Sequence, residues 1–149
     1  MRSPRLAVRA VIVERGKLLL VNAFRDPAKT LWCAPGGGVE RGSSLTENLA
    51  REIYEETGCY VRIGPLCLVS EFHNPEDRFH QVDLFFRATL STAPPQGAWT
   101  DPTGVVSRRR FFAPDELSDL HMTPPELARI AFDPASTVEV KDLVAMIRP

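Results

Sequence analysis

The sequence has few cysteines, no marked excess of one charge and no long apolar run. Its three cysteines form no Cys-x-x-Cys pair, which argues against a disulfide framework and against a zinc site. The formal net charge of −1 lacks the basic excess of a protein that binds nucleic acid or adheres to anionic membranes. No run reaches the ~18 apolar residues of a membrane helix, and the N-terminus lacks the apolar stretch of a signal peptide. Together these absences predict a soluble cytoplasmic protein.

The 149 residues, 44% of them hydrophobic, suffice for one domain over residues 1–149 with its own core. Alternating apolar residues predict strands at 5–14, 17–24, 60–72, 79–90 and 105–112. Loops are expected at 25–32, 73–78 and 91–104, and residues 34–42 are too rich in glycine for regular structure. Beyond the last strand, short helices are predicted at 114–120, 125–132 and 138–147. This order of elements predicts a mixed, partly antiparallel β-sheet with helices packed on it.

The clearest helix signals lie at residues 44–57. Ser44 and Glu47 form a capping box, in which each side chain bonds a backbone N–H of the first turn. Gly58 stands where a glycine commonly ends a helix. An apolar stripe runs along one face of the helix at four-residue spacing and consists of Leu45, Leu49 and Ile53.

Three carboxylates project from one side of this helix, because Glu52, Glu55 and Glu56 are spaced i, i+3, i+4. On a helical wheel Glu56 falls inside the apolar stripe, so it should point toward the body of the protein. A bare buried carboxylate costs several kcal/mol, and neighbouring like charges at the negative end of the helix dipole add to that cost. A bound divalent cation would relieve all of these effects.

Oxygen ligands without His or Cys nearby favour Mg²⁺ or Mn²⁺ over zinc. Directly before the helix, Gly36, Gly37 and Gly38 allow the backbone to approach a ligand closely. The alternative interpretation is that Arg51 and the surrounding glutamates form a solvated, salt-bridged helix face. The glycine segment and the inward position of Glu56 favour the cation.

These residues resemble the Nudix box, whose pattern is Gly-x5-Glu-x7-Arg-Glu-U-x-Glu-Glu-x-Gly-U, where U is bulky and apolar. Residues 37–59 read Gly37-x5-Ser43-x7-Arg51-Glu52-Ile53-Tyr54-Glu55-Glu56-Thr57-Gly58-Cys59. The preceding Trp32-Cys33-Ala34-Pro35-Gly36-Gly37 resembles the usual approach to the box. The order of strands around it is also similar to that of Nudix hydrolases over most of the chain. Two departures are Ser43, in place of a supporting glutamate, and Cys59, in place of a larger apolar residue.

The resemblance implies an α/β (α+β) fold, namely a Nudix-like α/β/α sandwich. It implies Glu52 and Glu56 as the principal metal ligands, assisted by Glu55 and by the backbone carbonyl of Gly36. Arg51 would orient the glutamates. The metal would be Mg²⁺, with Mn²⁺ as an alternative.

The implied reaction is metal-assisted attack of water on one phosphorus of a nucleoside diphosphate linked to X. Candidate substrates are nucleoside diphosphate sugars, ADP-ribose, dinucleoside polyphosphates and nucleoside triphosphates. Two residues are candidates for the general base, Glu55 and Asp101, and ordinary loop structure is the alternative for Asp101. Homodimers are common in families similar to this one, although the sequence does not fix the oligomeric state.

Substrate contacts outside the metal site are less clearly marked. The backbone at Gly37 and Gly38 would turn toward the ligand. Phe72 and His80 flank a loop beside the expected cleft, where an aromatic ring could stack on a base, and Arg25 could meet a phosphate. For each of these side chains, ordinary surface or core packing is the alternative.

Two other functions compete with the pyrophosphohydrolase. A nucleotide-sensing domain that has kept the fold and lost catalysis would account for Ser43, whereas the complete set of helix glutamates speaks against it. An RNA 5′-end pyrophosphohydrolase is disfavoured because the chain has no extended basic surface.

Overall fold

The computed structural model describes residues 3–133 and 137–147. Within these ranges the strands form one nine-stranded mixed sheet in the order β8-β3-β2-β1-β6-β5-β9, with β4 paired to β1 and β7 paired to β2. The strands are β1 (Arg5–Glu14), β2 (Lys17–Asn22), β3 (Trp32–Cys33), β4 (Gly36–Gly38), β5 (Val61–Asn74), β6 (Phe79–Leu90), β7 (Arg109–Phe112), β8 (Met122–Thr123) and β9 (Glu139–Ala145). The helices are α1 (Leu45–Thr57), α2 (Pro114–Leu117) and α3 (Leu127–Phe132).

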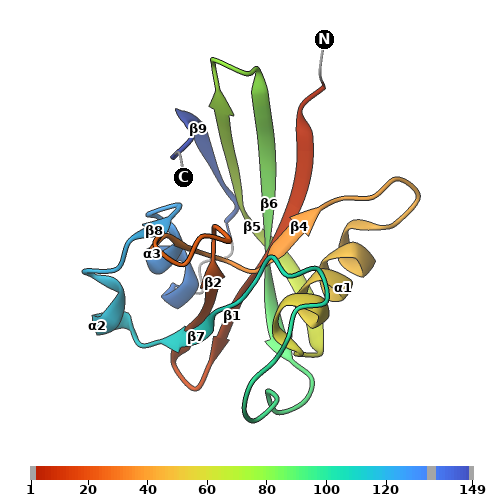
Figure 1. Cartoon of the computed structure of the whole chain (residues 1–149), viewed down its shortest axis with the longest axis vertical. Coiled ribbons are helices and arrows are strands. Elements are labelled where there is room, and N and C mark those ends of the chain that lie inside the picture. Colours follow the sequence, from red (N-terminus) through yellow and green to blue (C-terminus); the bar gives the residue numbers. More distant parts are fainter. Residues whose placement is uncertain (1–2, 134–136, 148–149) are drawn as a thin grey trace.

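Strand β1 lies inside the sheet and contributes to a core on each of its faces. Val8 and Ile12 pack with Leu49 of α1 in one core. Val11 points to the other face and packs in a core that includes Leu127 of α3. Figure 1 shows α1 and α3 on opposite sides of the sheet. The alternation of side chains along a strand thus produces the α/β/α sandwich that the resemblance implied.

The pairing of β1 places it between the later strand β6 and the glycine segment β4. It runs parallel to β6, with Arg5 opposite Gln81 and Ile12 opposite Ala88. It also runs antiparallel to β4, with Arg9 opposite Gly36. The glycine segment therefore lies directly against β1, at the start of the connection to α1.

Helix α1 begins and ends where the sequence predicts. The Ser44 hydroxyl accepts a hydrogen bond from the Glu47 amide at 3.1 Å, which is the N-cap half of the capping box. Gly58 adopts φ 72°, and its amide donates to the Tyr54 carbonyl at 2.8 Å. The left-handed conformation ends the helix. None of the helices in the described ranges combines the length and apolar character that a bilayer crossing demands.

The predictions for the glycine segment and for the C-terminal helix are wrong. Residues 36–38 form strand β4, because backbone pairing with β1 needs no side chains. The helix predicted at 138–147 is instead strand β9, which pairs in parallel with β5. Val140 and Val144 are four residues apart, as on a helix face, but β-branched side chains favour a strand once the edge of β5 offers partners.

The strand predicted at 105–112 is present only as β7, because the backbone amides of residues 106–108 donate to side chains rather than to the backbone of a neighbouring strand. The Val106 amide donates to Asp101 at 2.9 Å. The Ser107 and Arg108 amides both donate to the Asn22 side-chain oxygen at 2.9 Å. The strands predicted at 5–14 and 79–90 are found with those bounds. The other predicted strands and short helices are found with shifted ends, and β2 stops at Asn22 rather than Phe24.

Candidate functional site

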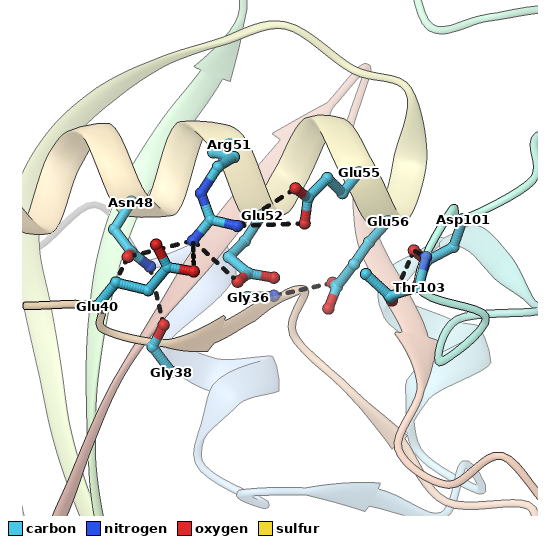
Figure 2. Close-up of polar contacts among 10 residues, drawn as sticks. All are labelled: Gly36, Gly38, Glu40, Asn48, Arg51, Glu52, Glu55, Glu56, Asp101 and Thr103. Carbon is cyan, nitrogen blue, oxygen red and sulfur yellow. Dashed lines mark hydrogen bonds and ion pairs between the residues drawn. The ribbon is translucent and has the colours of Figure 1, made fainter. Parts of the chain in front are cut away.

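Three carboxylates project from the last two turns of α1, and Figure 2 shows them with their polar partners: Glu52 and Glu56 point toward β4, whereas Glu55 lies beside Arg51. Glu56 is buried, with 8% of its surface exposed, and the Gly36 amide donates to its Oε2 atom at 3.0 Å. The inward position that the helical wheel predicted for Glu56 is confirmed. The structure brings Glu52 and Glu55 to the same side of the helix.

Arg51 lies among several carboxylates of this segment (Figure 2). Its guanidinium nitrogens lie 3.3 Å from Glu52, 3.2 Å from Glu55 and 3.4 Å from Glu40. Because the Arg51 side chain is 37% exposed, solvent screens these ion pairs, and each contributes little to the free energy of unfolding. The salt-bridged helix face considered from the sequence is therefore present, but it coexists with a buried Glu56 that it does not include.

Burial makes the Glu56 carboxyl a weaker acid than an exposed glutamate. Loss of hydration raises the pKa of Glu56 to about 8, and the negative charges of Glu52 and Asp101 act in the same direction. The nearby Arg9 guanidinium and the Gly36 amide oppose this rise but do not cancel it. Burial also raises the pKa of Glu52. Ionised Glu56 is consequently a charge that lacks sufficient compensation from the protein itself.

The donor set suits a hard divalent cation, although the side chains stand apart. Glu52 and Glu55 turn toward Arg51, whereas Glu56 turns toward the Gly36 amide. Accordingly, no three His, Cys, Asp or Glu side chains of residues 3–133 and 137–147 are grouped closely enough to hold an ion as they stand. The donors are all carboxylate oxygens, and the buried Glu56 needs positive charge beside it. Both properties fit Mg²⁺ or Mn²⁺, which would draw the carboxylates together.

The two glycines at the start of β4 are tightly surrounded, by different groups. A Cβ atom at Gly36 would lie 2.0 Å from the backbone oxygen of Val8. A Cβ atom at Gly37 would lie 2.6 Å from the carboxyl carbon of Glu52. Backbone cannot move aside easily, whereas the end of a flexible side chain can. Glycine at position 37 is thus required by the placement of the Glu52 carboxylate rather than by the fold.

The glycines provide a matched pair of variants that separates placement of Glu52 from stability. Gly36→Ala is expected to lower the free energy of unfolding by about 1–3 kcal/mol or more, because the backbone of β1 must shift. Gly37→Ala is expected to unfold close to the wild-type temperature while binding divalent cations more weakly, because the Glu52 carboxylate is displaced. Thermal unfolding and a Mn²⁺ titration of both variants test this. Equal loss of stability in the two variants would contradict it.

The carboxylates lie at the wall of a cavity of about 820 Å³, a size typical of small-molecule sites. The cavity is also lined by Gly37, Gly38 and Phe72, as expected from the sequence. The ring centroids of Phe72 and Phe79 are 6.0 Å apart. Glu126 and Lys141 line it from α3 and β9 and form an ion pair.

Two of the predicted substrate contacts do not reach this cavity. Arg25 is exposed to solvent and lies outside the cavity lining. His80 also lies outside the lining, and its Nε2 atom is 2.7 Å from Glu71 Oε1. The neighbours of His80 in β6, Phe79 and Gln81, face the cavity, so the alternation of the strand directs His80 to the other side.

Asp101 organises the loop that carries it. Its Oδ1 atom accepts hydrogen bonds from the amide and the hydroxyl of Thr103, both at 2.8 Å, and its Oδ2 atom accepts one from the Val106 amide at 2.9 Å. Burial alone would raise the pKa of Asp101, but these hydrogen bonds hold that pKa below its usual value. A carboxylate so engaged is a poor proton acceptor, which supports the loop-structure alternative and leaves Glu55 as the candidate base.

A chain of polar side chains along the cavity floor was not anticipated from the sequence. Arg5 donates to Gln81 at 2.7 Å, and Gln81 donates to Asp83 at 2.7 Å. Arg9 Nε lies 3.7 Å from Asp83, and its Nη1 donates to the Ala34 carbonyl at 3.1 Å. The available signal was the recurrence of polar residues at alternate positions of two strands, namely Arg5 and Arg9 in β1 and Gln81 and Asp83 in β6.

The structure explains why a cysteine can stand at position 59, where the Nudix box has a larger apolar residue. Cys59 is 1% exposed and packs in the same core as Leu49 and Ile53. A thiol in this position acts as a small apolar side chain. Ser43 lies before the helix, where its amide donates to the Glu40 carbonyl at 3.3 Å.

Comparison with known proteins identifies similar chains. A model of the NUDIX domain matches residues 3–133. An ADP-ribose pyrophosphatase of Methanocaldococcus jannaschii is 34% identical over 83 residues, which are 56% of this chain and 49% of the relative. A Bacillus subtilis protein provisionally named ADP-ribose pyrophosphatase YjhB is 29% identical over 135 residues, or 86% of this chain and 61% of the relative. The chain thus spans only 61% and 49% of the length of these two curated relatives.

Solved structures show the same likeness. A UDP-X diphosphatase has a TM-score of 0.68 and 28% identity, covering 89% of this chain and 63% of the other. A MutT NUDIX hydrolase from Burkholderia pseudomallei has a TM-score of 0.71 and 25% identity, covering 89% of this chain and 100% of the other.

Proposed function

Because the chain belongs to the NUDIX family, we propose that it is a divalent-metal-dependent hydrolase that uses water to cleave a phosphoanhydride bond of a nucleoside diphosphate derivative. The observation that carries this proposal is the buried Glu56 beside Glu52 and Glu55 at the wall of a large cavity. Three carboxylates in such a position are costly without a cation, and a cation there would meet phosphate groups entering the cavity.

The chain's own groups have distinct roles in this proposal. Glu52 and Glu56 would hold Mg²⁺ or Mn²⁺, with Glu55 and the Gly36 carbonyl assisting. When bound, such a cation supplies positive charge that polarises the phosphate oxygens and stabilises the leaving group. Arg51 orients Glu52 and Glu55 through its ion pairs. Glu55, whose carboxylate lines the cavity, accepts the proton of the attacking water.

A nucleoside diphosphate linked to a sugar is the proposed substrate class. The names of two similar proteins, ADP-ribose pyrophosphatase and UDP-X diphosphatase, both denote a nucleoside diphosphate linked to a further group, and in ADP-ribose that group is a sugar. The cavity of about 820 Å³ is large enough for a nucleotide and its substituent. Phe72 and Phe79 offer aromatic surface on its wall for a base.

A panel of ADP-ribose, UDP-glucose, diadenosine tetraphosphate and ATP tests the function. In the presence of Mg²⁺, we expect release of a nucleoside monophosphate from at least one of the first two compounds, and none after EDTA treatment. Hydrolysis in H₂¹⁸O would place the label on one of the two products and show which phosphorus is attacked. Tight binding of these compounds without turnover would contradict the hydrolase and favour the nucleotide-sensing domain.

A further inference from the structure

The last turn of α1, which carries Glu55 and Glu56, has its free backbone carbonyls bonded by two side chains from outside the helix. The Trp99 indole Nε1 donates to the Glu55 carbonyl at 2.9 Å. The Arg109 guanidinium donates to the Thr57 carbonyl. The final carbonyls of a helix have no partner within it, so such bonds fix the path of the terminal backbone. Here the two bonded carbonyls flank Glu56 on either side.

Trp99 also packs against the end of the helix. A Cβ atom at Gly58 would lie 2.6 Å from the Trp99 ring and 2.7 Å from Pro95, so the loop rests directly on the glycine backbone. The ring centroids of Tyr54 and Trp99 are 5.3 Å apart in an edge-to-face arrangement. Trp99 and Pro95 belong to the β6–β7 loop, residues 91–108, which also carries Asp101.

Arg109 joins this loop to the helix end. It lies at the start of β7, and its second terminal nitrogen, Nη2, donates to the Pro95 carbonyl at 3.3 Å and to the Gly97 carbonyl at 3.1 Å. The same guanidinium therefore bonds the helix and the loop that covers it. Its positive charge also stands at the negative end of the helix dipole, next to the turn that holds two glutamates.

We propose that Trp99 and Arg109 are positioning residues that fix the terminal turn of α1, and so the spacing of Glu55 and Glu56, for divalent-cation binding. This inference rests on the proposed function, because it assigns the two residues a role toward the cation held by those glutamates. Without the two bonds, the terminal turn frays and the two carboxylates must be ordered at the moment the ion binds. The cost appears as weaker ion binding.

Titration of Mn²⁺ alone into metal-free protein, with free Mn²⁺ measured by electron paramagnetic resonance, tests the proposal. Trp99→Phe retains an aromatic ring against Gly58 and removes the N–H donor. Arg109→Met removes the charge and all its bonds. Each is expected to raise the Mn²⁺ dissociation constant about tenfold or more, as loss of groups that orient metal ligands does. Arg109→Lys, which keeps a charge and a donor, is expected to raise it less.

The control is Arg129→Met, which breaks an exposed ion pair with Glu139 on α3 and β9 and is expected to bind Mn²⁺ as the wild type does. A second readout is the Mg²⁺ concentration for half-maximal hydrolysis, which should rise in the Trp99 and Arg109 variants while the rate at saturating Mg²⁺ largely recovers. Lower melting temperatures with unchanged Mn²⁺ affinity would overturn the positioning role alone. A wild-type protein that bound no Mn²⁺ would overturn the proposed function together with it.

Discussion

Replacement of Glu56 by Gln is expected to lower turnover by about a thousandfold or more, because a cation that stabilises transition-state charge contributes several kcal/mol. The amide oxygen of the substituted side chain can still accept the hydrogen bond that the Gly36 amide gives Glu56. The fold should therefore survive, and only the charge is lost. Steady-state kcat at saturating Mg²⁺, on whichever substrate the wild type hydrolyses, measures the effect, and circular dichroism verifies the fold.

Glu47→Gln is the matched control, because Glu47 is an exposed carboxylate in the first turn of the same helix. It should leave kcat near the wild-type value. Glu52→Gln should behave like Glu56→Gln. A near-wild-type rate in either of these variants at saturating Mg²⁺ would remove the assigned ligand from the site.

Without divalent cations, the protein is expected to lose stability as the pH rises from about 5 to about 9, and Glu56→Gln should lose much less. Folding raises the pKa of Glu56 from 4.5 to about 8, so between these values the folded state holds a proton that the unfolded state has released. The contribution of neutral Glu56 is fully present below the unfolded pKa and is lost as the pH passes through the folded one. Its upper limit is roughly 5 kcal/mol, from 1.36 kcal/mol per pKa unit.

Urea unfolding at pH 5, 7 and 9 in EDTA measures this dependence. The difference in unfolding free energy between Glu56→Gln and the wild type should grow with pH. Addition of Mg²⁺ at pH 9 should stabilise the wild type and have little effect on the variant, because a ligand that binds only the folded state raises its stability. Parallel pH profiles for the two proteins would show that Glu56 ionises normally.

Helix α1 and its inward glutamate were predictable because their signals are local. Ser44 and Gly58 define the two ends of α1 within the segment itself, and the wheel position of Glu56 follows from the helical period alone. The sequence could not predict which side chains from other elements bond the end of this helix. Trp99 and Arg109 reach it from a loop and a strand that lie 44 and 52 residues further along the chain, and nothing near them in sequence marks that contact.

The two segments whose type was predicted wrongly share a physical cause, which is pairing between distant strands. Residues 36–38 became a strand because β1 offered backbone partners, and residues 139–145 did so because the edge of β5 was open. Local periodicity does not report such partners. The polar chain from Arg5 to Asp83 depends in the same way on the register of β1 against β6, which no single segment encodes.

The parallel register of β1 with β6 also has a consequence for the nascent chain. Arg5 and Gln81 are 76 residues apart, so β1 leaves the ribosome long before its partner exists. At synthesis rates of about 5–20 residues per second, that interval lasts roughly 4–15 s. Throughout it, Val8 and Ile12 lack the neighbour that later covers one side of their strand, which exposes an apolar strand edge to other chains.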